Sequence, residues 1–292
     1  MSSRPKCILI TGPAHSGTRL LVQMLDKHPD VSAPMRYLTH VGEFRQLYFF
    51  FVRVMDATPL YSEEYVIDYD ELRFIMDAYM QNIDHSKPFC VLKMPFYPLI
   101  CLDWFINYFD GNLSLVYNSR PAEKIVRSFI NKKQDQFYFH EHNDEILRHI
   151  KKLPVERRKH YLATSDAPAF FHEYVLYGDQ LRQQWNKEHP ERQFIDVPIE
   201  NVATSRDNIE SFLQKLSLPI SRVDDMLSLV DPARLLRSAP TQTKRSHIVP
   251  RSQPRTQAIS NARRLKRFVH MLTPPILWQA GKKLIKRDVG ES

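Results

Sequence analysis

Short apolar runs alternate with longer amphipathic segments along the first 220 residues of the chain. The run at residues 7–11 is apolar, rich in β-branched residues and closed by Gly12, a pattern that predicts a strand buried on both faces. Comparable runs predict further strands at residues 89–92, 113–117 and 193–197. Apolar residues at helical spacing predict helices at residues 18–28, 44–55, 71–83, 97–108, 122–131, 169–187 and 207–216.

This alternation of strands and helices indicates an α/β fold. Strands that are separated by helices are joined by right-handed crossovers and lie parallel to one another. We therefore expect three layers, with a central, mostly parallel β-sheet flanked by helices. No linker rich in Gly, Ser or Pro interrupts the first 235 residues, so we expect one domain at residues 1–235 and a basic, partly helical extension at residues 236–292.

The composition is that of a globular protein, with 43% hydrophobic and 25% charged residues. The net charge of +8 comes from the C-terminal region, because residues 244–292 contain twelve Lys or Arg and only two acidic residues. The preceding residues contain 29 basic and 31 acidic side chains and are nearly neutral. Cys7, Cys90 and Cys101 are too few for a disulfide scaffold, so we expect reduced thiols. The chain contains neither a signal-peptide core nor about 18 consecutive apolar residues, and we expect a cytoplasmic protein.

The loop between the first predicted strand and the first predicted helix reads Gly-Pro-Ala-His-Ser-Gly-Thr-Arg at residues 12–19. A glycine-containing loop in this position turns backbone N–H groups toward an anion. It resembles a Walker A loop, but Thr18 follows Gly17 directly, and the lysine that reaches the terminal phosphates of ATP is absent. The loop therefore predicts an anion site, with an ordinary strand-to-helix turn as the alternative.

A second group of polar residues lies where the third predicted strand ends. Arg120 follows this strand, and Ser128 lies two helical turns later. This placement lets a guanidinium and a hydroxyl converge on one phosphate. A surface salt bridge for Arg120 and a solvated Ser128 are the alternative.

Together these segments resemble the sulfotransferase family that uses 3′-phosphoadenylyl sulfate (PAPS) as donor and releases adenosine 3′,5′-bisphosphate (PAP). In that family a Lys/Arg-Ser-Gly-Thr-Thr/Arg loop holds the 5′-phosphosulfate, and it corresponds here to His15, Ser16, Gly17, Thr18 and Arg19. An Arg and a Ser eight residues apart hold the 3′-phosphate, which implies these roles for Arg120 and Ser128. The resemblance extends over roughly residues 7–218 and implies a P-loop-like fold.

The resemblance also implies catalytic residues. Lys93, at the end of the second predicted strand, is similar to a lysine that acts near the transferring group in heparan-type sulfotransferases. Glu43 is similar to the catalytic Glu of protein-tyrosine and several bacterial sulfotransferases and is expected to take the acceptor proton, with neighbouring His40 as the alternative base. His15 stands where the family usually has Lys or Arg, so a group that titrates near pH 6.5 replaces a permanent charge beside the leaving phosphate.

We therefore expect a PAPS-dependent sulfotransferase that transfers a sulfuryl group to a hydroxyl or amine of a glycan, a glycolipid or a small metabolite. The histidines are scattered without metal-ligand spacing, so no metal is expected. Two alternatives remain. One is a P-loop kinase or other NTPase acting on a small molecule, against which the missing lysine argues. The other is a non-catalytic module that binds a nucleotide or another anionic ligand with the same fold.

The basic extension carries cationic and apolar side chains together at residues 262–287. This composition is typical of a helix that lies on a membrane surface or an anionic substrate, and a partly docked helix with solvated charges is the alternative. No nucleic-acid-binding motif accompanies the charge, so nucleic acid is not an expected partner.

Overall fold

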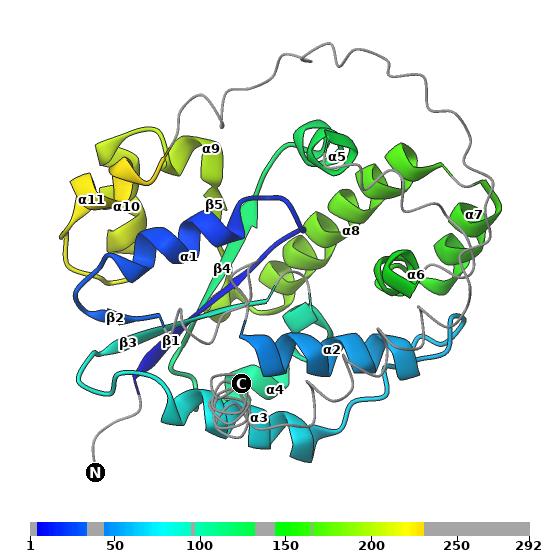
Figure 1. The fold of residues 1–292 in the computed structure, drawn as a ribbon, viewed down its shortest axis with the longest axis horizontal. Coiled ribbons are helices and arrows are strands. Elements are labelled where there is room, and N and C mark those ends of the chain that lie inside the picture. The colour runs from blue at the N-terminus through cyan, green and yellow to red at the C-terminus, as the bar shows by residue number, and fades with distance from the viewer. Residues whose placement is uncertain (1–4, 34–43, 95–96, 132–143, 165, 231–292) are drawn as a thin grey trace, which may run out of the picture. The chain divides into compact units, whose positions relative to one another are not determined.

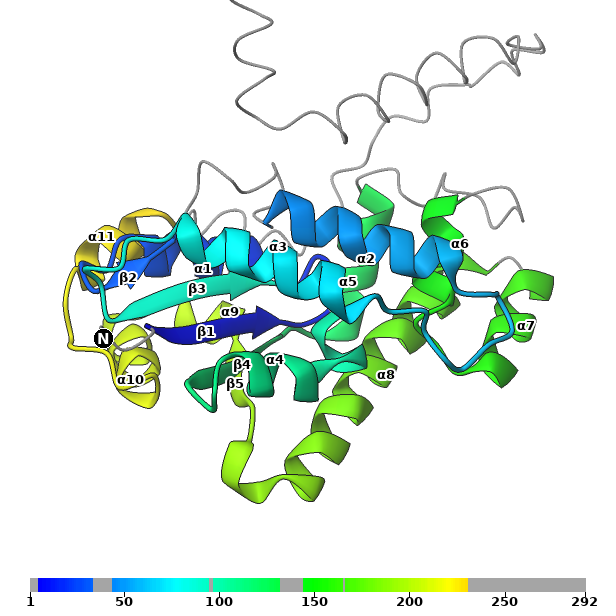
Figure 2. The ribbon, with the colours of Figure 1, turned by 90° about the horizontal axis from the view of Figure 1, so that it is seen from below.

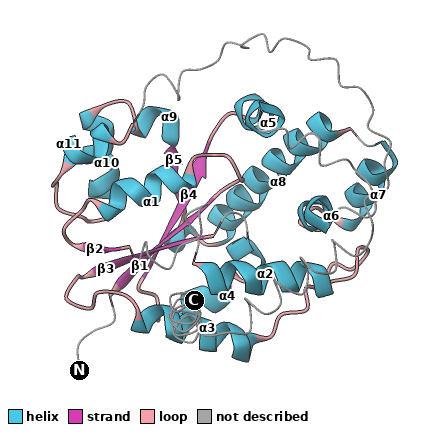
Figure 3. Ribbon diagram, in the orientation of Figure 1, coloured by secondary structure: helices cyan, strands magenta, loops and turns pink. Residues whose placement is uncertain are grey.

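The computed structural model describes residues 5–33, 44–94, 97–131, 144–164 and 166–230. Five strands form one sheet in the order β2-β3-β1-β4-β5, and every neighbouring pair is parallel (Figures 1 and 3). The strands are β1 (Lys6–Thr11), β2 (Val31–Ser32), β3 (Phe89–Lys93), β4 (Leu113–Ser119) and β5 (Ile195–Pro198). The predicted α/β fold with a central sheet of parallel strands is confirmed.

Strand β1 lies in the middle of the sheet, between β3 and β4. From β1 the chain adds β2 and β3 on one side and then crosses to add β4 and β5 on the other. Ligands of open parallel sheets bind beyond the carboxyl ends of the strands, at the point where the direction of the connections reverses. The loop at residues 12–17, which follows β1, lies at this point.

Both faces of the sheet are buried under helices (Figure 1). On one face lie α1 (Thr18–Asp26), α9 (Ile199–Val202), α10 (Arg206–Lys215) and α11 (Val223–Ser228), and on the other lie α2 (Arg45–Ala57), α3 (Tyr69–Gln81) and α4 (Leu102–Tyr108). In β1, Ile8 and Ile10 point into the first layer, whereas Cys7 and Leu9 point into the second. This alternation explains why the sequence of β1 is continuously apolar.

A third hydrophobic cluster lies beyond the carboxyl ends of the strands (Figure 2). It is formed by α5 (Ala122–Asn131), α6 (Asp144–Ile150), α7 (Val155–Thr164) and α8 (Ala167–Glu188). Its centre is aromatic, since the rings of Phe129 and Phe171 stack with centroids 3.8 Å apart. Ala14 packs against this cluster, so the loop after β1 is bordered by a hydrophobic core on the side away from the sheet.

Several element boundaries differ from the sequence prediction. The helix predicted at residues 97–108 is divided into a 3₁₀ turn, η2 (Tyr97–Ile100), and α4, because the backbone of Cys101 has φ −149° and ψ 38° and cannot continue a helix. The strand predicted at residues 193–197 is shifted to β5, which follows the 3₁₀ turn η4 (Pro190–Arg192) and pairs with β4 from Ile195 onward, because the backbone N–H of Phe194 bonds instead to Oδ1 of Asn186. The predicted boundary near residue 235 and the basic extension lie outside the described residues. Within the described part of the chain, no helix is long and apolar enough to cross a membrane.

The buried side chain of His28 ties the end of α1 to the segment before α11. Its Nε2 lies 2.8 Å from the carbonyl oxygen of Pro219, and its Nδ1 accepts a hydrogen bond of 3.2 Å from the backbone N–H of Asp30. These two contacts require the tautomer with the proton on Nε2.

We expect His28→Ala to lower the free energy of unfolding by about 2–4 kcal/mol, because it leaves a cavity and two backbone groups without their partners. Urea denaturation measures this change. The exposed His85 provides the control, and His85→Ala is expected to stay within about 0.5 kcal/mol of the wild type. Equal effects of the two substitutions would contradict the assignment.

Candidate functional site

The loop at residues 12–17 has an unusual backbone. Gly12, His15 and Gly17 have φ angles of +137°, +69° and +102°, and the N–H of Ser16 bonds back to the carbonyl oxygen of Pro13 at 3.1 Å. Positive φ at His15 is uncommon for a residue with a side chain. Turns that combine left-handed and right-handed residues form concavities in which backbone N–H groups bind anions.

Helix α1 begins directly after this loop without a side-chain cap. Gly17 occupies the N-cap position and has no side chain with which to cap the first turn. Among the described residues, the backbone N–H groups of Thr18 and Arg19 have no acceptor. Together with the positive end of the helix dipole, these N–H groups provide donors for a phosphate or sulfate group.

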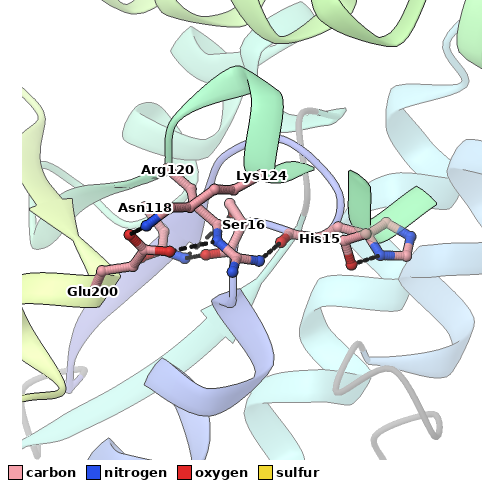
Figure 4. A network of polar contacts seen from close by, with 7 residues as sticks. His15, Ser16, Asn118, Arg120, Lys124 and Glu200 are labelled. Carbon is pink, nitrogen blue, oxygen red and sulfur yellow. Dashed lines mark hydrogen bonds and ion pairs between the residues drawn. The ribbon is translucent and has the colours of Figure 1, made fainter. Parts of the chain in front are cut away.

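The carboxyl end of β4 holds the loop in place (Figure 4). The amide of Asn118 donates to the carbonyl oxygen of Ser16 at 2.8 Å and to its hydroxyl at 3.3 Å, and both residues are completely buried. A Cβ atom on Gly12 would lie 2.5 Å from the carbonyl oxygen of Asn118, so only glycine permits this close approach. Asn118 was not predicted as a site residue, and the available signal was its position directly after a predicted buried strand.

His15 joins the loop to α5. Its Nδ1 lies 3.1 Å from the hydroxyl oxygen of Ser128, and its ring packs against Phe129 with centroids 4.1 Å apart. The backbone carbonyl of His15 accepts a hydrogen bond of 3.3 Å from Nη1 of Arg120. The structure thus brings the loop at residues 12–17 next to Arg120 and Ser128, the second group of predicted site residues.

Arg120 also belongs to an ion-pair network (Figure 4). Its Nε donates to Oε1 of Glu200 at 3.1 Å, while Nζ of Lys124 pairs with Oε2 of the same carboxylate. Burial alone raises the pKa of Glu200, but hydrogen bonds from Lys124 and Arg120 outweigh it and hold this pKa below its ordinary value. Glu200 and Lys124 were not predicted as site residues, because Glu200 lies 80 residues after Arg120 in the sequence and only the fold brings the two together.

The remaining predicted residues are placed as follows. Lys93 is buried at the end of β3, in register with Ile10 of β1 and therefore beside the loop that follows β1. Arg19 is exposed on the first turn of α1, and its side chain makes no hydrogen bond or ion pair with another described residue. Glu43 and His40 lie outside the described residues. Among the residues that are described, no group of three or more His, Cys, Asp or Glu is arranged to hold a metal ion.

Behind His15, the ring of His149 lies among aromatic side chains, with centroid distances of 6.3 Å to Phe129 and Phe171 and 5.5 Å to Tyr174. Burial lowers the pKa of His149 well below its ordinary value, and the charges of Lys152, His15 and Arg148 lower it further. His149 is therefore neutral in the folded protein at neutral pH.

This histidine predicts a loss of stability in acid. Because the folded pKa of His149 lies below its value in the unfolded chain, about 6.5, the unfolded state takes up a proton below that pH and the native state does not. His149→Phe should therefore flatten the pH dependence of the free energy of unfolding between pH 7 and 5, by up to about 1.4 kcal/mol per pH unit. Urea titrations of the wild type, His149→Phe and the exposed control His85→Phe measure this slope. Equal slopes for all three proteins would contradict the expectation.

No protein-family model matches the chain, and no curated protein matches it. Among solved structures, sulfotransferase STF9 from Mycobacterium avium is similar with a TM-score of 0.43 and 11% sequence identity, over 78% of this chain and 67% of that one. Sulfotransferase STF1 from Mycobacterium tuberculosis H37Rv is similar with a TM-score of 0.38 and 14% identity, over 78% of this chain and 72% of that one. Neither similarity assigns a residue or an activity to this chain.

Proposed function

We propose that this protein is a sulfotransferase that uses PAPS as donor. The observation that carries the proposal is the pair of contacts made by His15. Its carbonyl oxygen bonds to Arg120 and its ring nitrogen lies against the hydroxyl of Ser128, so the loop expected to hold the 5′-phosphosulfate adjoins both residues expected to hold the 3′-phosphate. These contacts join segments more than 100 residues apart in the sequence.

The residues fit a donor that carries two anionic groups. Free N–H groups of Thr18 and Arg19 and the loop of positive φ angles suit the 5′-phosphosulfate. Among the described residues, Nη2 of Arg120 has no partner, and it suits the 3′-phosphate together with Ser128. The absence of the Walker lysine distinguishes this loop from one that holds the terminal phosphates of ATP.

The donor supplies the sulfuryl group, and the side chains of this chain position it and balance charge. Lys93 and Arg19 stabilise negative charge at the sulfuryl oxygens, and His15 supports the leaving phosphate. Glu43 takes the proton of the acceptor, a role for which a carboxylate works best when burial raises its pKa.

We further propose that the protein is cytoplasmic and that its acceptor is a hydroxyl or amine of a glycan, a glycolipid or a small metabolite. In this proposal the basic extension contacts a membrane or another anionic surface.

Transfer of label tests this function. The protein is incubated with PAPS carrying ³⁵S and a panel of glycans, glycolipids and small hydroxyl or amine compounds, and labelled products are separated from PAPS. We expect label in an acceptor with the wild type, and at least a 100-fold lower rate with Lys93→Ala, since removal of one charge-stabilising group costs about 10²–10³ in rate. A parallel reaction with ATP labelled at the γ-phosphate and Mg²⁺ should give no product. Labelled product from ATP with Mg²⁺, and none from PAPS, would indicate a kinase instead.

A further inference from the structure

The ion-pair network beside the loop places two cationic side chains around one carboxylate. Two cationic side chains, Arg120 and Lys124, converge on Glu200. The carboxylate offers one oxygen to each, Oε1 to Arg120 and Oε2 to Lys124. Arg120 bonds to Glu200 through Nε alone, and within the described part of the chain its Nη2 has no acceptor.

A second arginine in the same chain shows what a complete pair looks like. Arg148 donates from Nε and from Nη2 to the two oxygens of Asp56, at 2.6 and 2.8 Å. These two nitrogens form one edge of the guanidinium and match the spacing of two oxygens on one anion. In Arg120 only Nε of this edge bonds to Glu200, and the second oxygen of Glu200 bonds to Lys124.

A phosphate monoester presents three terminal oxygens. Three donor nitrogens are available to them, Nε and Nη2 of Arg120 and Nζ of Lys124. The network is also accessible to a ligand, since the side chains of Arg120, Lys124 and Glu200 are 17%, 37% and 20% exposed. Lys124 lies on the first turn of α5, and Arg120 lies in the short connection between β4 and that helix, so both cations reach the same carboxylate from neighbouring positions.

We propose that Lys124 binds the 3′-phosphate of the nucleotide together with Arg120, and that Glu200 is an internal counter-anion which this phosphate displaces. This inference rests on the proposed function, because it assigns residues to the same nucleotide. Glu200 competes with the ligand: in the free protein it neutralises one of the two cations, and the bound nucleotide takes over its hydrogen bonds. It thereby sets the affinity for nucleotides that carry a 3′-phosphate, without touching the 5′ end.

The consequence is that removing the carboxylate strengthens binding. Glu200→Gln keeps the shape of the side chain and removes its charge, so the phosphate no longer has to break two ion pairs. Ion pairs at such partly exposed positions are worth a few tenths to one kcal/mol each, so PAP should bind about 3- to 30-fold more tightly to Glu200→Gln than to the wild type. Lys124→Gln should bind PAP about 3- to 30-fold more weakly. Neither variant should change the affinity for 5′-AMP, which lacks the 3′-phosphate.

Calorimetric titration of the full chain with PAP and with 5′-AMP tests the proposal. Glu123→Gln is the matched control, because it removes one carboxylate from the residue next to Lys124. Among the described residues, the exposed side chain of Glu123 lies 4.0 Å from Nε2 of His172 and makes no hydrogen bond or ion pair with Arg120 or Lys124, so this variant should bind PAP like the wild type. Thermal unfolding checks that each variant is folded. If Glu200→Gln does not fold, Glu200→Asp replaces it, because the shorter side chain cannot bridge both cations and should also tighten PAP binding.

Tighter PAP binding by the Glu200 variant, weaker binding by Lys124→Gln and unchanged binding by Glu123→Gln would support the inference. Unchanged or weaker PAP binding by the Glu200 variant would overturn it, as would unchanged binding by Lys124→Gln. In both of these cases PAP binding by the wild type leaves the proposed function standing. A wild type that binds no PAP refutes the proposed function, and the inference with it.

Discussion

Replacing Arg120 with alanine is expected to weaken PAP binding by about 10- to 150-fold and to leave the affinity for 5′-AMP within about twofold of the wild type. The reason is that a charge-assisted bidentate contact to a phosphate contributes about 1.5–3 kcal/mol, and only PAP carries the 3′-phosphate that this contact binds. Calorimetric titration of both nucleotides measures the two ratios.

The selectivity of the effect is the informative part, because Arg120 also donates to the carbonyl oxygen of His15 and supports the loop. Arg120→Lys is the companion variant: it keeps the charge, loses the planar edge of donors and should give an intermediate PAP affinity. Equal losses for PAP and 5′-AMP would mean that Arg120 acts on the loop as a whole and does not bind the 3′-phosphate.

Gly12→Ala is expected to lower the free energy of unfolding by at least about 3 kcal/mol. Two costs combine at this position: φ is +137°, which side chains rarely adopt, and the new Cβ would lie 2.5 Å from the carbonyl oxygen of Asn118. To relieve the clash between the new Cβ and Asn118, the loop must move away from the end of β4, so the variant should also lose PAP binding. Urea denaturation followed by circular dichroism measures the stability.

Gly111→Ala separates the two costs. Gly111 also has positive φ, +73°, but the nearest atom to an added Cβ is a flexible arginine nitrogen of Arg192 at 4.0 Å. We expect a loss of about 1–2 kcal/mol from the left-handed backbone alone. If Gly12→Ala destabilised the protein no more than Gly111→Ala does, the close approach of the loop to β4 would be wrong.

The sheet could be predicted from the sequence because its central strands are buried on both faces and therefore read as continuous apolar runs. Among the described elements, β2, α6, α7, α9 and α11 were not predicted. Two of them show the physical reasons. Strand β2 has only two residues, Val31 and Ser32, too few for any periodicity. Helix α7 lacks an apolar stripe, since the side chain that it buries most deeply is Arg158, which donates to the carbonyl oxygens of Leu153, Leu60 and Ser62.

Only part of the candidate site could likewise be predicted from the sequence. The sequence places His15, Ser16, Arg120 and Ser128 relative to the ends of two strands, and the structure brings these residues together. Their roles in binding stay predictions. The partners that hold them could not be predicted. The pairing of Arg120 with Glu200 spans 80 residues and depends on where α9 begins, which no local pattern determines.

The central claim is that the loop after β1 and the end of β4 bind a nucleotide with a 3′-phosphate, and titration of the wild type with PAP, 5′-AMP and ATP with Mg²⁺ tests it most directly. We predict that one PAP binds per chain without Mg²⁺, at least about tenfold more tightly than 5′-AMP. ATP with Mg²⁺ should bind more weakly than PAP, because the lysine that reaches its terminal phosphates is missing. No binding of PAP, or tighter binding of ATP with Mg²⁺ than of PAP, would contradict the claim.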